Sequence, residues 1–298
     1  MKILLLGKDG QLGRQLHRTL AVLGDVVAPG RQELDISCQT ATRAKIRDVS
    51  PQLIVNAAAY TAVDRAEKEP GVAHSMNAVA PGVLASEALV LGARLVHYST
   101  DYVFDGESSR PYTEEDSPNP QNVYGASKLA GERSVMAAGG QFLIFRTSWM
   151  FSGQANNFAS TMLRLAGEQD SLSVVADQIG APTSADFIAD VTARILTELL
   201  HCRADEACSG IYHLTASGET SRCDYARFLI ERATALGLSL KCRPEDVAPT
   251  MTDDFPMPAR RPKNSRLSTS KLRSTFGIIT PHWSEHVDRM LVTLAGQT

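Results

Sequence analysis

Apolar and polar residues follow two alternating spacings along the first half of the chain. Short apolar runs, such as residues 2–6 and 53–56, have the composition of buried parallel strands. The segments between these runs repeat apolar residues at helical spacing, as Leu12, Leu16 and Leu20 do. Alternating strands and helices are typical of a parallel sheet wound on both faces, so we expect an α/β fold. The pattern predicts strands at 2–6, 26–28, 53–56, 94–99 and 142–146, and helices at 11–23, 40–49, 72–91 and 124–136.

The alternation weakens after residue 150. Helical spacing returns at 157–167, 186–200, 223–235 and 282–294. We expect residues 1–150 to form the main α/β domain and residues 151–298 to form a smaller, mixed α/β substrate-binding region. Part of that region, at about 183–215, is expected to return and pack on the first domain.

A long loop at 101–122 interrupts the pattern and carries Pro111, Pro118 and Pro120. Loops of this length are usually functional or disordered. Its position after a predicted strand favours a loop on the substrate side, and a solvated connection is equally consistent with the composition.

Composition argues against several function classes. The 298 residues include 30 basic and 33 acidic residues, so charge gives no reason to expect nucleic acid or a membrane surface as a partner. No apolar stretch approaches the roughly 20 residues of a membrane span, and the apolar start is too short for a signal peptide. The five cysteines form no CxxC pair. We therefore expect a reduced, cytoplasmic protein without a bound metal.

Three glycines, Gly7, Gly10 and Gly13, lie between the first predicted strand and the first predicted helix. Glycines at such a turn let the backbone approach a pyrophosphate and let the helix pack on the strand, while the helix N-terminus supplies N–H donors. The spacing GxxGxxG departs from the better-known GxGxxG, and a tight turn without a ligand can have it too. Its place after an N-terminal apolar strand favours a dinucleotide site in a Rossmann-like domain.

The adenosine end of that site is less clear in the sequence. An acidic residue about 20 positions on would bind the ribose 2′-hydroxyl, but the segment after the second strand carries Arg31. Arg31 could accept a 2′-phosphate, which favours NADPH or use of both NADPH and NADH, or it could be a surface arginine. Asp35 and Ile36 are candidates to lie against the adenine.

Tyr124 and Lys128 lie four residues apart in the sequence YGASK, on one face of a predicted helix. A free phenol has a pKa of about 10, and a neighbouring ammonium lowers it, which suits a general acid. An isolated YxxxK is more often a half-buried tyrosine beside a lysine. Here Thr100 ends a predicted strand, where open α/β sheets bind ligands, and its hydroxyl can hold a substrate oxygen.

These residues resemble the extended short-chain dehydrogenase/reductase superfamily, and more narrowly the family of dTDP-4-dehydrorhamnose reductases. The narrower resemblance extends over nearly the whole chain and is most specific in the C-terminal half. It rests on VNAAAYTAVDRAE (55–67), HYSTDYVFDG (97–106), NVYGASKLAGE (122–132), FRTSW (145–149), NNFASTMLRLA (156–166), DQIGAPT (177–183) and RPKNSRL (261–267).

The resemblance implies NAD(P)H-dependent reduction of the C4 ketone of dTDP-4-dehydro-L-rhamnose, a small-molecule nucleotide sugar. It implies Thr100, Tyr124 and Lys128 as catalytic residues. Near the cofactor it adds Gln11, Leu12, Ala59, Tyr60 and Thr61 to the glycines, Asp35 and Ile36. Near the sugar nucleotide it implies Thr100, Asp101, Trp149 and Asn157, with Arg261 as a contact for the diphosphate.

Two other functions remain open. The chain could reduce or epimerise a different nucleotide sugar, or it could be a non-catalytic subunit like the regulatory subunit of methionine adenosyltransferase, which resembles the same family. Some relatives dimerise around magnesium held by glutamates, whereas the matching positions here are Gln15 and Ser284. These are poor ligands for that ion, so we expect no metal and a monomer or a homodimer formed in another way.

Overall fold

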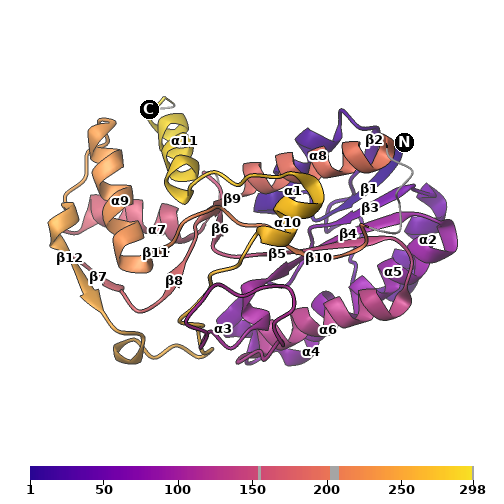
Figure 1. Ribbon diagram of the computed structural model, residues 1–298, viewed down its shortest axis with the longest axis horizontal. Coiled ribbons are helices and arrows are strands. Elements are labelled where there is room, and N and C mark those ends of the chain that lie inside the picture. The colour runs from indigo at the N-terminus through magenta and orange to yellow at the C-terminus, as the bar shows by residue number, and fades with distance from the viewer. Residues whose placement is uncertain (154–155, 202–207, 297–298) are drawn as a thin grey trace.

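A six-stranded parallel sheet forms the centre of the computed structural model, which describes residues 1–153, 156–201 and 208–296 (Figure 1). Adjacent strands pair in the order β10-β5-β4-β3-β1-β2, and every pair is parallel. The chain therefore belongs to the α/β class, as predicted. The strands are β1 (Lys2–Leu6), β2 (Asp25–Val27), β3 (Leu53–Asn56), β4 (Arg94–Thr100), β5 (Phe142–Thr147) and β10 (Gly210–His213).

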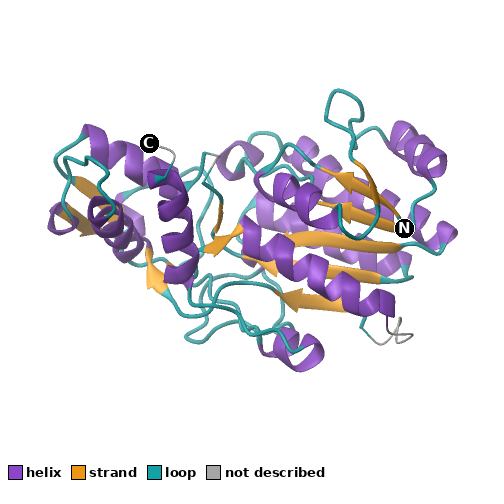
Figure 2. Ribbon diagram, turned by 90° about the horizontal axis from the view of Figure 1, so that it is seen from above, coloured by secondary structure: helices purple, strands orange, loops and turns teal. Residues whose placement is uncertain are grey.

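Helices cover both faces of this sheet (Figures 1 and 2). On one face, Leu12, Leu16 and Leu20 of α1 share a core with residues of α8. Strands β1, β3, β4 and β5 are mostly buried because helices lie on both sides, whereas the outer strand β2 is partly exposed. On the other face, α2 and α5 pack on the alternate strand residues, such as Leu4 and Ile54. The helices are α1 (Gln11–Leu20), α2 (Gln39–Val49), α5 (Ala80–Leu91), α6 (Val123–Ala138), α8 (Ala185–His201) and α10 (Ser270–Phe276).

The prediction of a single helix at 72–91 is wrong in one respect. Helix α4 (Pro70–His74) and α5 are joined by a π-helical segment, Ser75–Val79, with wider hydrogen-bond spacing. This segment carries the buried Asn77, whose amide donates to the Tyr60 carbonyl at 3.0 Å and to the Ser127 hydroxyl at 2.9 Å. Asn77 thereby ties the segment after β3, which includes the short α3 (Val63–Ala66), to the YGASK helix.

The C-terminal residues build a second core beside the sheet, seen at the left of Figure 2. Two small parallel strands lie against helix α9, and short strand pairs connect this part to the main sheet. The helices are α7 (Phe158–Glu168), α9 (Arg222–Ala235) and α11 (Trp283–Ala295). The strands are β6 (Met150–Phe151), β7 (Leu172–Val175), β8 (Ile179–Gly180), β9 (Thr183–Ser184), β11 (Thr220–Ser221) and β12 (Val247–Thr250).

Residues after 183 also return to the first half of the chain. Helix α8 packs on α1, and β10 pairs with β5 as the edge strand of the main sheet. The expected return of residues 183–215 as part of the domain organisation, and the division at residue 150, stay predictions. No helix in the described ranges is long and apolar enough to cross a bilayer.

The 101–122 loop begins with a short 3₁₀ turn, Asp101–Val103, and is held by the C-terminal region. The ring of Tyr112 stacks on Phe104 at 4.2 Å, and its backbone N–H donates to the Arg266 carbonyl at 2.9 Å. The loop is therefore bound along its middle to the segment that follows Arg261, so it forms part of one wall of the cleft described next.

Candidate active site

A cavity of about 660 Å³ opens where the carboxyl ends of the central strands meet. Parallel sheets bind ligands at this edge because the loops after the strands diverge there. The cavity is lined by Gly10–Leu12 at the start of α1, Ala59 and Thr61 after β3, Thr100–Tyr102 after β4, and Thr147–Phe151 after β5. Tyr124 and Lys128 of α6 complete its wall.

The glycine turn lets the backbone of the first strand, the start of α1 and the segment after β3 pack closely together. Gly7 has φ +85°, and a Cβ there would lie 2.6 Å from the Ala58 backbone nitrogen. A Cβ on Gly13 would lie 1.8 Å from the Gly7 carbonyl oxygen, so helix and strand could not pack so closely with any side chain there. Gly10 caps α1 without a side-chain hydrogen bond, and it lines the cavity. The N–H groups at this helix end are therefore suited to binding phosphate oxygens.

Tyr124 and Thr100 meet in the same cavity. Helix α6 begins after Asn122, whose side chain accepts from the Gly125 N–H at 2.8 Å, and this fixes Tyr124 in the first turn. Thr100 lies close enough to Tyr124 for hydrogen bonding between the two side chains to lower the pKa of the phenol. The Thr100 hydroxyl also lies 3.1 Å from the Asp101 carboxylate. The arrangement places a phenol and a threonine hydroxyl at one point of the cavity wall.

Lys128 lies on the same helix face but is directed at another group. Its ammonium donates to the Tyr98 carbonyl at 2.5 Å, and its side chain is 2% exposed. Burial lowers the pKa of Lys128 to about 8, with Glu132 opposing the shift. Burial raises the pKa of Tyr124, and its hydrogen bond to Thr100 lowers it. Acidification of the phenol by Lys128 is not among these influences and stays a prediction.

The residues predicted for the adenosine end lie outside this cavity. Arg31 and Asp35 are exposed, and Asp35 accepts hydrogen bonds from the backbone and hydroxyl of Ser37, which lower the pKa of its carboxyl. Ile36 is buried in the core of the sheet. Tyr60 also does not line the cavity, because its hydroxyl is turned to Glu69 at 2.8 Å. Their roles in cofactor binding stay predictions.

The predicted substrate residues Trp149, Asn157 and Arg261 also line the cavity. Trp149 has φ +45°, which is rare for a bulky residue and marks a constrained position. Asn157 donates to the Gln11 side chain at 3.1 Å and so connects α7 with the glycine turn. Arg261 donates to Asp64 at 2.6 Å through one nitrogen, while its other terminal nitrogen is buried and has no hydrogen-bond partner among the described residues.

The sequence analysis missed a second arginine, Arg222, at the first position of α9. Its guanidinium lies 3.6 Å from the ring centre of Trp149 and 4.8 Å from that of Phe158. Among the described residues, no carboxylate forms an ion pair with Arg222. No motif marked this arginine, and the antiparallel pairing of β11 with β8 brings it to the cavity.

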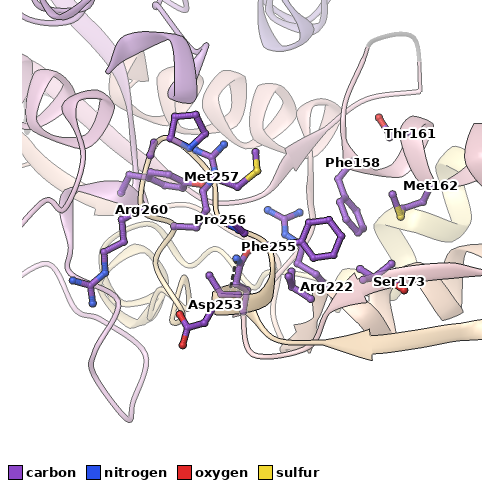
Figure 3. Close-up of a pocket in the computed structure, with 18 residues that line it drawn as sticks. Phe158, Thr161, Met162, Ser173, Arg222, Asp253, Phe255, Pro256, Met257 and Arg260 are labelled. Carbon is purple, nitrogen blue, oxygen red and sulfur yellow. Dashed lines mark hydrogen bonds between the residues drawn. The ribbon is translucent and has the colours of Figure 1, made fainter. Parts of the chain in front are cut away.

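Beyond Arg222 lies a further cavity of about 920 Å³ (Figure 3). It shares Tyr102, Phe158, Arg222 and Arg261 with the first cavity, so the two form one cleft. Phe255, Pro256 and Met257 border it on one side and Phe158 and Met162 on the other. The cleft therefore runs from the glycine turn, past the tyrosine and two arginines, to a mainly apolar chamber.

Candidate metal ligands do not gather anywhere in the part of the chain that the structure describes. No group of three or more histidine, cysteine, aspartate or glutamate side chains there is placed to hold a metal ion.

A parallel α/β sheet with a glycine turn, a threonine, a tyrosine and a lysine at one edge defines an NAD(P)-dependent oxidoreductase of the short-chain dehydrogenase/reductase class. The chain belongs to the RmlD substrate binding domain family, which matches residues 1–295. The α/β fold, the enzyme class and the family resemblance predicted from the sequence are thus confirmed.

Three relatives illustrate the match. The dTDP-4-dehydrorhamnose reductase of Escherichia coli (strain K12) is 45% identical over 98% of this chain and 97% of its own length. That of Burkholderia thailandensis is 46% identical over 95% of both chains. The crystal structure of dTDP-4-dehydrorhamnose reductase from Bacillus anthracis in complex with NADP superposes with a TM-score of 0.88 at 34% identity, covering 98% of this chain and 99% of that one.

Proposed function

We propose that this chain reduces the C4 ketone of dTDP-4-dehydro-L-rhamnose with NADPH or NADH and releases dTDP-L-rhamnose. The observation that carries the proposal is that Tyr124 and Thr100 line one cavity together with the uncapped start of α1. The relatives that match over the full length bear the name of this reaction. We further propose a cytoplasmic monomer or homodimer.

A nicotinamide cofactor fits the residues at the glycine turn. The N–H groups at the start of α1 suit a pyrophosphate, and Ala59 and Thr61 leave room beside it. When bound, the cofactor supplies the hydride. Lys128 lines the same cavity as the glycine turn and Tyr124, and its ammonium is expected to bind a ribose hydroxyl.

Tyr124 acts as the proton donor in this proposal. Its phenol donates to the C4 oxygen as negative charge develops there, and Thr100 donates a hydrogen bond to the same oxygen. Burial raises the pKa of Tyr124, so the phenol is protonated at neutral pH and ready to give its proton. Donors fixed in a cavity before reaction need no reorientation in the transition state.

Arg222 and Arg261 bind the diphosphate of the sugar nucleotide. Both line the junction between the two cavities, and one buried terminal nitrogen of Arg261 has no hydrogen-bond partner in the part of the chain that the structure describes. A guanidinium matches phosphate oxygens in charge and geometry. The mainly apolar chamber bordered by Phe158 and Met257 then receives the nucleoside, and Trp149 lies near the sugar.

The decisive experiment follows NADPH and NADH oxidation with dTDP-4-dehydro-L-rhamnose and identifies the sugar formed. We expect dTDP-L-rhamnose from either cofactor. Turnover of UDP- or GDP-linked keto sugars in preference to the dTDP sugar would replace this substrate with another. Absence of oxidation with every keto sugar, together with capture of a methionine adenosyltransferase, would favour the non-catalytic alternative.

Two phenylalanine variants test the role of Tyr124. Tyr124→Phe should lower kcat by a factor of roughly 100 or more, because it removes a general acid, and should leave NADPH affinity nearly unchanged. Tyr212→Phe is the matched control: its hydroxyl donates to the Cys208 carbonyl, away from the cleft, so its kcat should equal that of the parent. Equal kcat in both variants contradicts the assignment.

A further inference from the structure

Behind Lys128, two buried polar residues face each other across neighbouring strands. Asn56 ends β3, His97 lies opposite it in β4, and each is 1% exposed. The Asn56 amide nitrogen is 3.1 Å from Nδ1 of His97, and Nε2 of His97 is 3.4 Å from Nζ of Lys128. Neither residue lines the cleft. The His97 ring is therefore placed to act on the reaction through Lys128.

The hydrogen bonds fix which ring nitrogen of His97 carries the proton. Asn56 accepts from the Ala58 N–H through Oδ1 at 3.2 Å, so its NH₂ group faces the ring. An amide nitrogen only donates, so Nδ1 of His97 accepts and the proton of a neutral ring sits on Nε2. Burial, aided by the charge of Lys128, lowers the pKa of His97 well below its ordinary value, so the ring is neutral.

Lys128 consequently faces an N–H group. An ammonium has three donors and no acceptor, whereas a neutral amine has a lone pair that can accept from Nε2–H. We propose that Asn56 and His97 are positioning residues that present this N–H to Lys128, hold its side chain in the cleft wall and favour its neutral form. The kinetic consequence rests on the proposed reduction, whereas the geometry does not.

The other charges around Lys128 do not account for this effect. Glu132, one turn along α6, favours the ammonium, but Arg146 binds both of its oxygens at 2.9 and 2.6 Å. The direct acceptor at Nζ is the backbone carbonyl of Tyr98, which serves the amine and the ammonium alike. Further ionisable side chains on the helix itself and on elements packed against it are Tyr124, Arg133, Arg94, Tyr98, Asp101, Tyr102, Asp64, Arg65, His74 and Glu87. Within the described residues, the hydrogen bonds of Lys128 go to the Tyr98 carbonyl and to His97, and not to any of these side chains.

Nitrogen NMR of the histidine rings tests the geometry without any substrate. In the full-length protein, His97 should show a proton on Nε2 and a bare Nδ1, and His97→Gln assigns its signal by removing it. His213 is the internal reference of opposite type, because its buried Nδ1 donates to the Tyr112 carbonyl at 3.1 Å. A proton on Nδ1 of His97, or a doubly protonated ring at pH 7, overturns the proposal.

Asn56→Asp reverses the polarity of the pair with little change in shape. The carboxylate still accepts from Ala58 but now also accepts from Nδ1–H, so a bare Nε2 faces Lys128 and accepts from its ammonium. A hydrogen bond to the charged form favours that form, so the high-pH limb of kcat/KM for the keto sugar should move up by about one pH unit.

The double variant Asn56→Asp/His97→Phe controls for the added charge. If the ring transmits the effect, the shift should be much smaller in the double variant. An equal shift in both variants, or no shift in Asn56→Asp, overturns the proposal. The ring spectrum of Asn56→Asp should show the proton moved to Nδ1 even if no keto sugar is reduced, which separates a failure of this proposal from a failure of the proposed function.

Discussion

The ion pair between Arg146 of β5 and Glu132 of α6 allows a quantitative test of how the sheet edge behind the cleft is held. Its two hydrogen bonds measure 2.9 and 2.6 Å, and the side chains are 2% and 0% exposed. Arg146→Met keeps most of the apolar stem and leaves the Glu132 carboxylate buried without its partner. Breaking a buried pair in this way costs about 3–5 kcal/mol of unfolding free energy.

A surface pair provides the matched control. Arg164 and Glu168 of α7 lie 2.7 Å apart but are 59% and 55% exposed. Solvent screens this pair, so Arg164→Met should cost only about 0.3–0.5 kcal/mol. Urea unfolding at pH 7 measures both variants. The double variant Arg146→Met/Glu132→Leu removes the stranded charge and should recover most of the loss.

Two results would refute this reasoning. One is an Arg146→Met variant that loses no more stability than Arg164→Met, which would show that water reaches the pair. The other is a double variant no more stable than Arg146→Met, which would show that lost packing and not the stranded carboxylate causes the damage.

Two further predictions concern the turn and the strand end. Gly13→Ala should weaken NADPH binding roughly tenfold or more, because the methyl carbon would overlap the Gly7 carbonyl oxygen; Gly167→Ala, which meets open space, should bind as the parent does in the same fluorescence titration. Burial raises the pKa of Asp101 to about 6. Between about pH 4 and pH 6 this carboxyl ionises more readily in the unfolded chain than in the folded protein, so the unfolding free energy falls as the pH rises. The unfolding free energy of Asp101→Asn, measured in urea, should therefore rise relative to that of the parent by about 2–3 kcal/mol across that range. Unfolding free energies that change with pH in parallel in the two proteins would contradict this.

Much of the main sheet could be predicted because buried parallel strands are short apolar runs between helices. The runs at 2–6 and 53–56 match β1 and β3. The edge strand β10 was not predicted as a strand, because its four residues, Gly210–His213, are defined by pairing with β5 and not by composition. The π-helical segment at Asn77 was also missed, since a local change of hydrogen bonding leaves apolar spacing almost unchanged.

The candidate site also contains residues that the sequence could predict and residues that it could not. Thr100, Tyr124 and Gly10 could be proposed because strand ends and glycine turns meet at one edge of such a sheet. Arg222 could not, since a short strand pair within the C-terminal region brings it beside Trp149. A residue that is placed by local strand pairing of this kind has no characteristic spacing in the sequence, so a single sequence does not reveal it.

The spacing of Tyr124 and Lys128 predicts a shared helix face but not the partner of either group. The fold supplies the Tyr98 carbonyl and the N–H side of His97 to the lysine, and Thr100 to the tyrosine. Burial then moves the two pKa values in opposite directions, raising that of the phenol and lowering that of Lys128 to about 8. We therefore expect an ionisation near pH 8 in the reaction to report Lys128 and not the phenol, although the sequence alone favoured the phenol.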